Sequence, residues 1–350
     1  MPDLIEFINR MPKVELHLHL EGSIRPVTAL ELFYRQNPGA PHIDYSELSK
    51  LYRFDSLGEF VNGMQRITNN IQSLEDLQRI TAELLESLCK QNVHYVEFDC
   101  AVQKYLDIGF PLDVIIDSIY TVVKNFQMQN RIVANLNINL LRGHGPEKAE
   151  RLVQQIIALN HPFIRGIGLS GDEAAVQQKE FTLAFQIARE AGLHRTAHAG
   201  ESMGAQSIWD AIHYLQVERI DHGTRASEDD QLMDYLALYK IPLTQCLTSN
   251  VRLKVVDSYE QHPFQQFLQR GICVTLNTDD PHVFDITLTG EYQVAAMTFN
   301  LTALELRQIV LNSIRASFMS DEEKNHMQRM IAVEIDALLS HIGREKTALA

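Results

Sequence analysis

The stretch that decides the fold is Lys13-Val14-Glu15-Leu16-His17-Leu18-His19, near the N-terminus of the chain. If residues 14–19 form a strand, side chains two positions apart point to the same face. The imidazoles of His17 and His19 can then reach one metal ion from a rigid support. The alternative is a chance pair of histidines, because short motifs also match by accident. The rest of the chain decides between these two interpretations.

Short β-rich runs alternate along the chain with longer segments of helical periodicity. The predicted strands are residues 14–19, 94–98, 131–140, 164–169, 195–199, 219–222, 241–246 and 273–279. The predicted helices between them include residues 74–91, 111–129, 147–159, 180–191, 205–215 and 229–238, each long enough to cross back over a sheet. This alternation predicts an α/β fold, and eight such units predict a single (β/α)8 TIM barrel.

We expect one domain over residues 1–350, because no repeat, linker or shift in composition divides the chain. Two additions to a plain barrel are expected. The connection from about residue 20 to 92 is longer than one helix needs, and its segment 54–60 suggests a lid over one mouth of the barrel. Residues from about 285 to 340 predict amphipathic C-terminal helices, including 303–317 and 321–339, before a frayed polar end.

Bulk properties narrow the class of partner. The chain has 350 residues and a formal net charge of −14. Such an acidic surface repels phosphate backbones and anionic membranes, so we expect a small-molecule substrate and neither a nucleic-acid nor a membrane partner. The four cysteines lack CxxC spacing, which argues against a disulfide framework or a cysteine-based zinc site. No targeting or membrane-spanning segment is evident, so we expect a cytoplasmic protein, and its oligomeric state is left open.

Polar motifs follow several of the predicted strands. Catalytic groups of such barrels lie at the carboxyl ends of the strands, where loops converge on one opening. Taken singly, each motif has a plainer interpretation as a turn, a loop or a helix N-terminus. Together with His17 and His19, however, they bring His, Glu and Asp side chains to one rim. The motifs are His198-Ala199-Gly200-Glu201, Asp221-His222-Gly223-Thr224 and Asn277-Thr278-Asp279-Asp280-Pro281.

This donor set predicts a hydrolytic zinc site. Three histidines and one carboxylate with an open coordination position are typical of a zinc ion that activates water. We assign His17, His19, His198 and Asp279 as the ligands.

Acid and base groups remain beside these ligands. Glu201, His222 and Asp280 supply the equipment that a hydrolytic deamination needs. Glu201 suits protonation of a ring nitrogen, and His222 suits handling of the proton of the attacking water. Nine further histidines, His262 among them, are expected to be surface or packing residues.

At these residues the chain resembles the adenosine and AMP deaminase family of zinc-dependent barrel hydrolases, from about residue 11 to 302. The motif Gly168-Leu169-Ser170-Gly171-Asp172-Glu173 contributes to the resemblance. The resemblance implies one Zn²⁺ per chain on the four ligands, Glu201 as proton donor to purine N1, and His222 holding the attacking hydroxide. It also implies that Gly171 donates its N–H to N3 and that Asp280 meets N7. Residues 170–172 carry no lysine of the kind that bridges two metals in binuclear relatives, which favours a single zinc.

The function implied first is deamination of adenosine or 2′-deoxyadenosine to inosine or 2′-deoxyinosine plus ammonia. We place His19, Glu21, Gly171 and Asp280 beside the substrate. Glu21, however, stands where the family usually has an Asp that contacts the ribose 5′-hydroxyl, and Asp221 stands where a Gly is usual, as in adenine deaminases.

Several alternatives therefore stay open. Residues 246–251 and 258–264 look similar to the N6-methyl-AMP deaminase branch. Adenine, N6-methyl-AMP and 5′-modified adenosines are thus alternative substrates. A barrel hydrolase acting on a cyclic amide or pterin-like ring is a third interpretation. A non-catalytic nucleoside-binding barrel is the alternative from another class, and it is disfavoured because no ligand is replaced and Glu201 is present.

Overall fold

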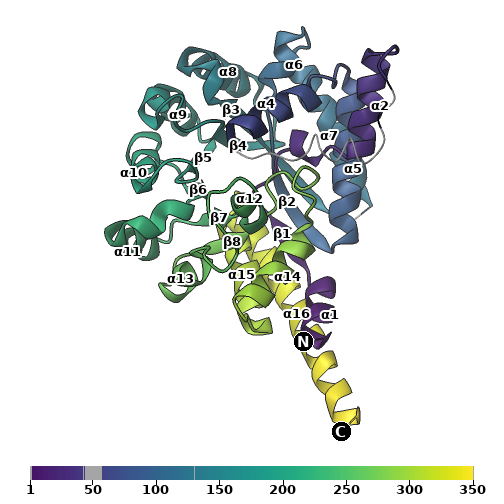
Figure 1. Ribbon diagram of the computed structural model, residues 1–350, viewed down its shortest axis with the longest axis vertical. Coiled ribbons are helices and arrows are strands. Elements are labelled where there is room, and N and C mark those ends of the chain that lie inside the picture. Colours follow the sequence, from purple (N-terminus) through teal and green to yellow (C-terminus); the bar gives the residue numbers. More distant parts are fainter. Residues whose placement is uncertain (1, 42, 44–56, 130, 350) are drawn as a thin grey trace.

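Eight strands form one sheet in the order β1 to β8 in the computed structural model, which describes residues 2–41, 43, 57–129 and 131–349 (Figure 1). All seven neighbouring pairs along this order are parallel. The strands are β1 Lys13–Glu15, β2 Val93–Cys100, β3 Val133–Leu141, β4 Ile164–Ser170, β5 His194–Ala199, β6 Arg219–His222, β7 Leu243–Gln245 and β8 Val274–Leu276. The predicted (β/α)8 barrel is confirmed.

The barrel closes between its first and last strands through a few contacts beyond their ends. The His19 N–H donates to the Asp279 carbonyl at 2.8 Å, and the Asp279 N–H donates to the His17 carbonyl at 3.0 Å. Side chains also join the first and last strands along this seam between β1 and β8. Asn277 Oδ1, for example, accepts the Leu16 N–H at 3.0 Å. These contacts draw the two histidines and Asp279 to the same point of the rim.

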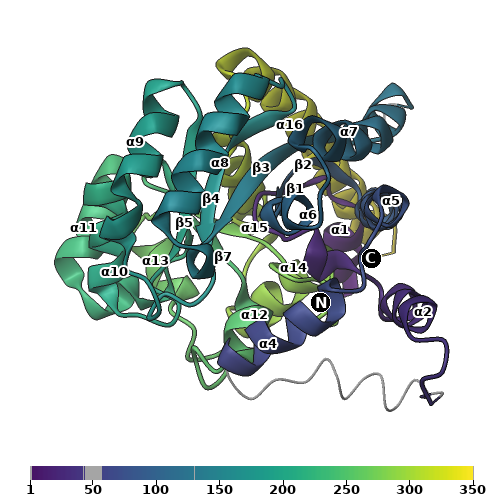
Figure 2. The ribbon, with the colours of Figure 1, turned by 90° about the horizontal axis from the view of Figure 1, so that it is seen from above.

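Helices surround the barrel, as the view from above shows (Figure 2). The helices that follow strands in the barrel are α5 Leu74–Lys90, α7 Leu112–Met128, α8 Pro146–Leu159, α9 Thr182–Glu190, α10 Ala205–Asp210, α11 Asp230–Tyr239, α13 Phe264–Gln269 and α15 Ala303–Ala316. Local sequence signals fix several of their ends. Ser73 and Asp76 form a capping box at the start of α5, and Thr302 and Glu305 form another at the start of α15.

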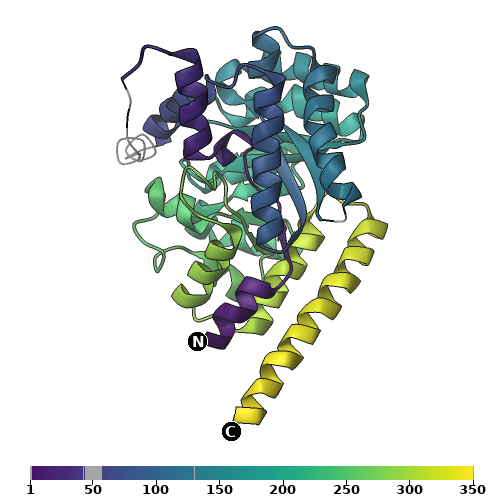
Figure 3. The same ribbon diagram turned by 90° about the vertical axis from the view of Figure 1, so that its right-hand side faces the viewer.

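Further helices decorate this core. They are α1 Pro2–Arg10, α2 Pro26–Gln36, α4 Leu57–Thr68, α6 Gln103–Asp107, α12 Leu247–Arg252, α14 Leu288–Thr298 and α16 Asp321–Leu349. The extra helices expected after the first strand and at the C-terminus are thus present. Both chain termini lie at the same end of the molecule, where α16 extends away from the barrel (Figure 3). Among the helices that the structure describes, none has the length and apolar composition needed to cross a membrane.

The strand ends differ most from expectation. The predicted strands 14–19, 241–246 and 273–279 are longer than β1, β7 and β8, which have three residues each. Residues 17–19 and 277–279 leave the regular ladder because side chains, among them Asn277 and Glu15, take up backbone N–H groups at the seam. The C-terminal prediction was also wrong in part, because α16 continues to Leu349 instead of ending near residue 339.

The long connection after β1 is described only in part. Residues 42 and 44–56 lie outside the described residues, so residues 54–56 of the segment 54–60 singled out in the sequence have no structural account. The described helix α4 packs against the chain that follows β8, where the rings of Phe60 and Phe284 stack at 5.4 Å. Met64 joins the same small apolar cluster with Leu253 and Val283. This part of the connection therefore packs on the chain that carries Asp279 and Asp280.

Candidate metal centre and active site

Four imidazole rings gather at the carboxyl ends of the strands. His17 and His19 follow β1, His198 lies in β5, and His222 ends β6. The ring centroid of His17 lies 4.8 Å from that of His198 and 4.9 Å from that of His222. His19 lies 5.4 Å from His17 and 5.2 Å from His198. The three predicted histidine ligands therefore meet, although His17 and His19 do so from irregular backbone.

Asp279 supplies the carboxylate of this cluster. Its Oδ1 lies 3.3 Å from Nε2 of His17 and 3.3 Å from Nε2 of His19. Its Oδ2 accepts the hydroxyl of Ser249 at 2.6 Å. Asp279 has a φ of 65°, a left-handed conformation that non-glycine residues seldom adopt and that recurs at functional sites.

The electrostatics of the cluster suit a bound cation. Burial lowers the pKa of His17, but the Asp221 and Asp279 carboxylates outweigh it and hold that pKa well above its usual value. Burial likewise lowers the pKa of His19, but the hydrogen bond to Asp279 and the charge of Asp280 raise it to about 9. The pKa of Asp279 stays well below its usual value, since its contacts with His17 and His19 outweigh burial. The site therefore stabilises positive charge where a metal ion would compete with protons.

The residues present fit a zinc ion. Burial, followed by the neighbouring His17 and His222 charges, holds the pKa of His198 well below its usual value, so its imidazole is neutral. Within the described ranges, the buried Nε2 of His198 has no hydrogen-bond partner. Ligand atoms of His17, His19 and His198 lie within 4.8 Å of one another, as do those of His17, His222 and Asp279. A buried neutral imidazole with an unused lone pair, two more imidazoles and a carboxylate form a zinc donor set.

Glu201 lies beside this donor set. Its Oε2 is 3.7 Å from Nδ1 of His198, and its Oε1 is 3.7 Å from Nε2 of His222. Burial raises the pKa of Glu201, and the Asp279 carboxylate adds to the rise, while His222 opposes it. A neutral carboxyl can donate a proton, as the role predicted from the sequence requires.

A second buried carboxylate, Glu173, holds the backbone of this loop. Its Oε1 accepts the N–H groups of Glu201 at 2.9 Å and Ser202 at 3.1 Å. Its Oε2 accepts the Gly200 N–H at 3.1 Å and the Ser207 hydroxyl at 2.6 Å. Glu173 was quoted in the sequence without a role, and only the fold reveals that it positions Glu201.

We therefore expect Glu173→Gln to lower kcat by about 10- to 100-fold while zinc content stays the same, because an amide N–H₂ would face backbone donors. The lost hydrogen bonds should also lower the free energy of unfolding by about 1–3 kcal/mol. Steady-state kinetics, elemental analysis and urea unfolding measure the three effects, with Glu180→Gln on the exposed surface as the matched control. An unchanged kcat in Glu173→Gln would contradict the positioning role.

Asp280 lies next to the donor set and is packed closely. A Cβ at residue 22 would overlap the Asp280 carboxylate, so Gly22 is needed where it stands. Burial and the Asp279 charge raise the pKa of Asp280 well above its usual value. A protonated Asp280 can donate a hydrogen bond to an acceptor such as a ring nitrogen.

Two more of the predicted substrate residues lie in the loops that follow β1 and β4. Glu21 turns to the end of β2, where its Oε1 accepts the Ala101 N–H at 3.0 Å. The Tyr105 hydroxyl also reaches the same oxygen at 3.5 Å. Gly171 has a φ of 93°, so its backbone adopts a conformation that favours glycine, and a Cβ there would meet only the backbone and Cβ of Arg142.

Residues that the sequence left without a role support the ligands. Asp221 Oδ1 lies 3.1 Å from Nδ1 of His17 and accepts the Thr244 hydroxyl at 3.0 Å. Asn139 contacts Nδ1 of His19 at 3.2 Å. Such partners orient the rings of metal-binding histidines. The register that pairs Asp221 with Thr244 on adjacent strands is the signal that could have identified this pair.

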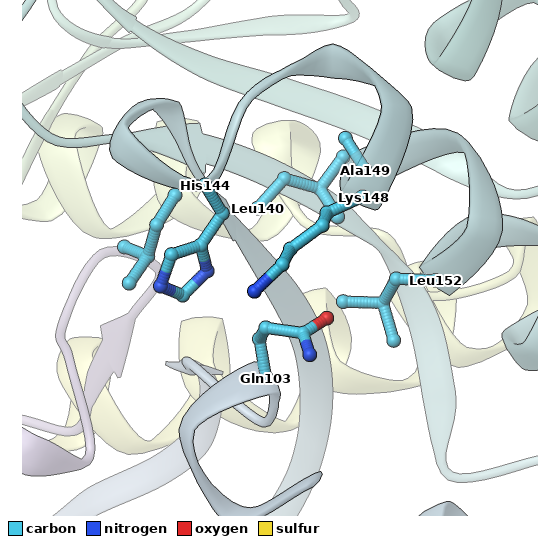
Figure 4. Close-up of a pocket in the computed structure, with 7 residues that line it drawn as sticks. Gln103, Leu140, His144, Lys148, Ala149 and Leu152 are labelled. Carbon is cyan, nitrogen blue, oxygen red and sulfur yellow. The ribbon is translucent and has the colours of Figure 1, made fainter. Parts of the chain in front are cut away.

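A separate hollow lies beside the end of β3, between α6 and α8 (Figure 4). Its polar tips are those of Gln103, His144 and Lys148, and Ala149 and leucines from β3 and α8 line the rest. Burial and the Lys148 charge lower the pKa of His144. None of its seven lining residues is a predicted site residue, so the hollow is distinct from the metal centre.

Comparisons with known proteins agree with this geometry. Residues 12–334 match the family model described as adenosine deaminase. An adenine deaminase of Crocosphaera subtropica is 35% identical over 320 residues, covering 91% of this chain and 98% of that protein. An adenosine deaminase of Clostridium kluyveri is 32% identical over 329 residues, covering 93% and 94%. The crystal structure of an amidohydrolase from Burkholderia ambifaria with bound zinc has a TM-score of 0.89 and 27% identity, covering 98% of this chain and 96% of that one.

Proposed function

This chain belongs to the adenosine deaminase family and is a hydrolytic deaminase of adenosine- or adenine-like purines, and we propose that it uses one zinc ion held by His17, His19, His198 and Asp279. The observation that carries the proposal is the meeting of three imidazoles and one carboxylate beside Glu201, whose pKa burial raises. The zinc-bound relative from Burkholderia ambifaria supports the choice of metal.

The reaction replaces the amino group at C6 of the purine by oxygen from water and releases ammonia. A zinc ion in this donor set would supply a water molecule of lowered pKa. Glu201, whose pKa burial raises, donates a proton to N1, so that the ring accepts electrons as oxygen adds at C6. Asp280, whose pKa is raised by burial, meets N7, and the Gly171 N–H serves N3. These two contacts orient the flat ring.

Reaction in oxygen-18 water tests this chemistry. We expect the zinc-loaded protein to place one oxygen-18 atom at C6 of the product and to release ammonia, both measured by mass spectrometry and an ammonia assay. Product without the heavy oxygen would contradict hydrolysis.

Among 6-aminopurines, the contacts of Glu21 favour the free base adenine as substrate. Its Oε1 is engaged by the Ala101 N–H, with Tyr105 and Cys100 next to it, so this oxygen serves the protein itself. A free base makes no demand on the residue that would meet a ribose 5′-hydroxyl. The adenine deaminase relative at 35% identity supports this choice. Adenosine and 2′-deoxyadenosine, placed first by the sequence, are the second candidates, supported by the Clostridium kluyveri relative.

Glu21→Asp tests this selectivity. The shorter side chain should withdraw from the Ala101 N–H and leave its carboxylate free for a 5′-hydroxyl. We expect the ratio of kcat/KM for adenosine to that for adenine to rise by about tenfold, the effect of one hydrogen bond. Glu21→Gln is the matched control, because it keeps the length of the side chain. An unchanged ratio in Glu21→Asp would show that this position does not read the 5′ end.

Other features remain proposals about the same enzyme. We propose that residues 1–350 form one domain, with the connection from 20 to 92 acting as a lid through the packing of α4 near Phe284. The substrate is a small purine.

A further inference from the structure

We propose that His262 and Asn250 form a relay of hydrogen bonds that fixes the tautomer of His222 with its proton on Nε2. His262 and Asn250 are thus positioning residues that act through His222. The inference rests on the proposed active site, because His222 faces Glu201 and Asp279 there. It also gives a purpose to the two segments, 246–251 and 258–264, that the deaminase motifs do not cover.

The relay begins at a hydrogen bond whose donor and acceptor are certain. The Phe264 N–H contacts Nδ1 of His262 at 3.2 Å, and a backbone N–H can only donate. Nδ1 of His262 must therefore accept, so it carries no proton. Burial lowers the pKa of His262 to about 3, which agrees with a neutral ring. A neutral ring with a bare Nδ1 carries its proton on Nε2.

The second step fixes the amide of Asn250. Nε2 of His262 lies 3.0 Å from Oδ1 of Asn250, and the N–H of His262 makes this oxygen an acceptor. The Thr224 hydroxyl donates to the same oxygen at 2.7 Å. With Oδ1 held by two donors, the N–H₂ group of Asn250 must face the other way.

The third step sets the tautomer of His222. Nδ2 of Asn250 lies 3.2 Å from Nδ1 of His222, so the amide donates and Nδ1 accepts. With Nδ1 bare, the ring carries its single proton on Nε2. That atom is buried and has no hydrogen-bond partner among the described residues, and it lies 3.7 Å from Oε1 of Glu201.

His222 therefore presents an N–H to the reaction site. In this form it donates a hydrogen bond to the oxygen that attacks C6 and holds that oxygen in place. Because Nε2 already carries a proton, this atom cannot accept another one from the attacking water, as a general base would. Of the two roles expected from the sequence, the relay favours holding the attacking oxygen over general-base catalysis.

The chain contains a second copy of the turn in which a backbone N–H donates to Nδ1 of a histidine, and this copy serves as an internal control. His161-Pro162-Phe163 repeats the tripeptide His262-Pro263-Phe264, and the Phe163 N–H again donates to Nδ1 of His161 at 3.2 Å. Nε2 of His161, however, faces the exposed Asp117 at 3.5 Å and not the active site. The same substitution at the two positions separates the relay from the local turn.

The tautomer can be observed directly in the zinc-loaded full chain labelled with ¹⁵N-histidine. We expect the ring signals that disappear in His222→Gln to show the pattern of a ring protonated on Nε2 and bare on Nδ1. In Asn250→Asp, a nearly isosteric carboxylate can only accept, so the neutral ring should instead show protonation on Nδ1. A wild-type His222 protonated on Nδ1, or on both nitrogens at neutral pH, would overturn the proposal.

Kinetics give the second readout. In Asn250→Asp the bare Nε2 of His222 no longer offers the N–H that holds the attacking oxygen, so we expect kcat to fall by about 10²–10⁴-fold. We expect His262→Phe to lower kcat by about 10- to 100-fold, His262→Gln to recover most of the loss through its amide N–H, and His161→Phe to leave kcat unchanged. Equal losses in His262→Phe and His161→Phe, with no change in the His222 signals, would overturn the relay.

The two readouts separate this inference from the proposed function. The NMR measurement needs no substrate, so it tests the relay even if the protein deaminates no purine. Conversely, deamination with the wrong His222 tautomer would leave the proposed function intact and remove the relay.

Discussion

Replacing Glu201 by glutamine is expected to reduce deamination by about 10²–10⁴-fold while leaving one zinc ion bound per chain. An amide has the shape of the protonated carboxyl but cannot release a proton to N1. The substitution should preserve the loop, because Glu173 holds it through backbone N–H groups at residues 200–202. The measurements are kcat/KM with the purine substrate and zinc content by elemental analysis.

The zinc content also decides between two donor sets. Side chains of His198, Glu201 and His222 lie close enough to hold a metal by themselves. If Glu201→Gln lost its zinc, Glu201 would be a ligand and not a proton donor. Near-normal turnover with zinc retained would remove Glu201 from catalysis altogether.

Replacing Asp279 by alanine is expected to abolish both zinc retention and activity. The carboxylate lies 3.3 Å from Nε2 of both His17 and His19, and without it three imidazoles remain as ligands. Ser249 would not replace the lost ligand, because its hydroxyl donates to the Asp279 carboxylate and would lose this acceptor. Zinc content after dialysis against a chelator measures the effect.

Asp279→Asn protects this test against simple misfolding. Asparagine tolerates the left-handed conformation that residue 279 adopts, whereas alanine does so at a cost of about 1–2 kcal/mol. Asp280→Asn is the matched control, because it removes a neighbouring carboxyl that is not an assigned ligand and should keep the zinc. Retention of one equivalent of zinc in both Asp279 variants would contradict the ligand assignment.

Much of the barrel follows from periodicity. Strands such as β2 and β4, buried along most of their length, and helices with capping residues such as Ser73 have local signals in the sequence. The ends of β1 and β8 were predicted too long, because the barrel closes there through side chains, and pairing between residues 15 and 278 is invisible in a local pattern. Tertiary contacts decide where regular strands stop.

The site shows the same division. Residue type and position at strand ends were sufficient to predict that His17, His198 and Asp279 come together, because parallel strands deliver their ends to one rim. The orientation of the side chains and the polarity of their hydrogen bonds were not predictable. Glu21 Oε1 accepts the Ala101 N–H, and the roles of Glu173 and His262 depend on which hydrogen-bond donors meet them. Hydrogen-bond polarity is a property of the folded network and not of any motif.

The measurement that tests the central claim most directly is kcat/KM for adenine, adenosine, 2′-deoxyadenosine, AMP and N6-methyl-AMP, with zinc-loaded and zinc-depleted protein in parallel. The account predicts deamination by the zinc-loaded protein with adenine as the best substrate, no turnover after zinc removal, and recovery with one equivalent of zinc. A zinc-loaded protein that binds purines but converts none of them would contradict the account and favour a nucleoside-binding barrel.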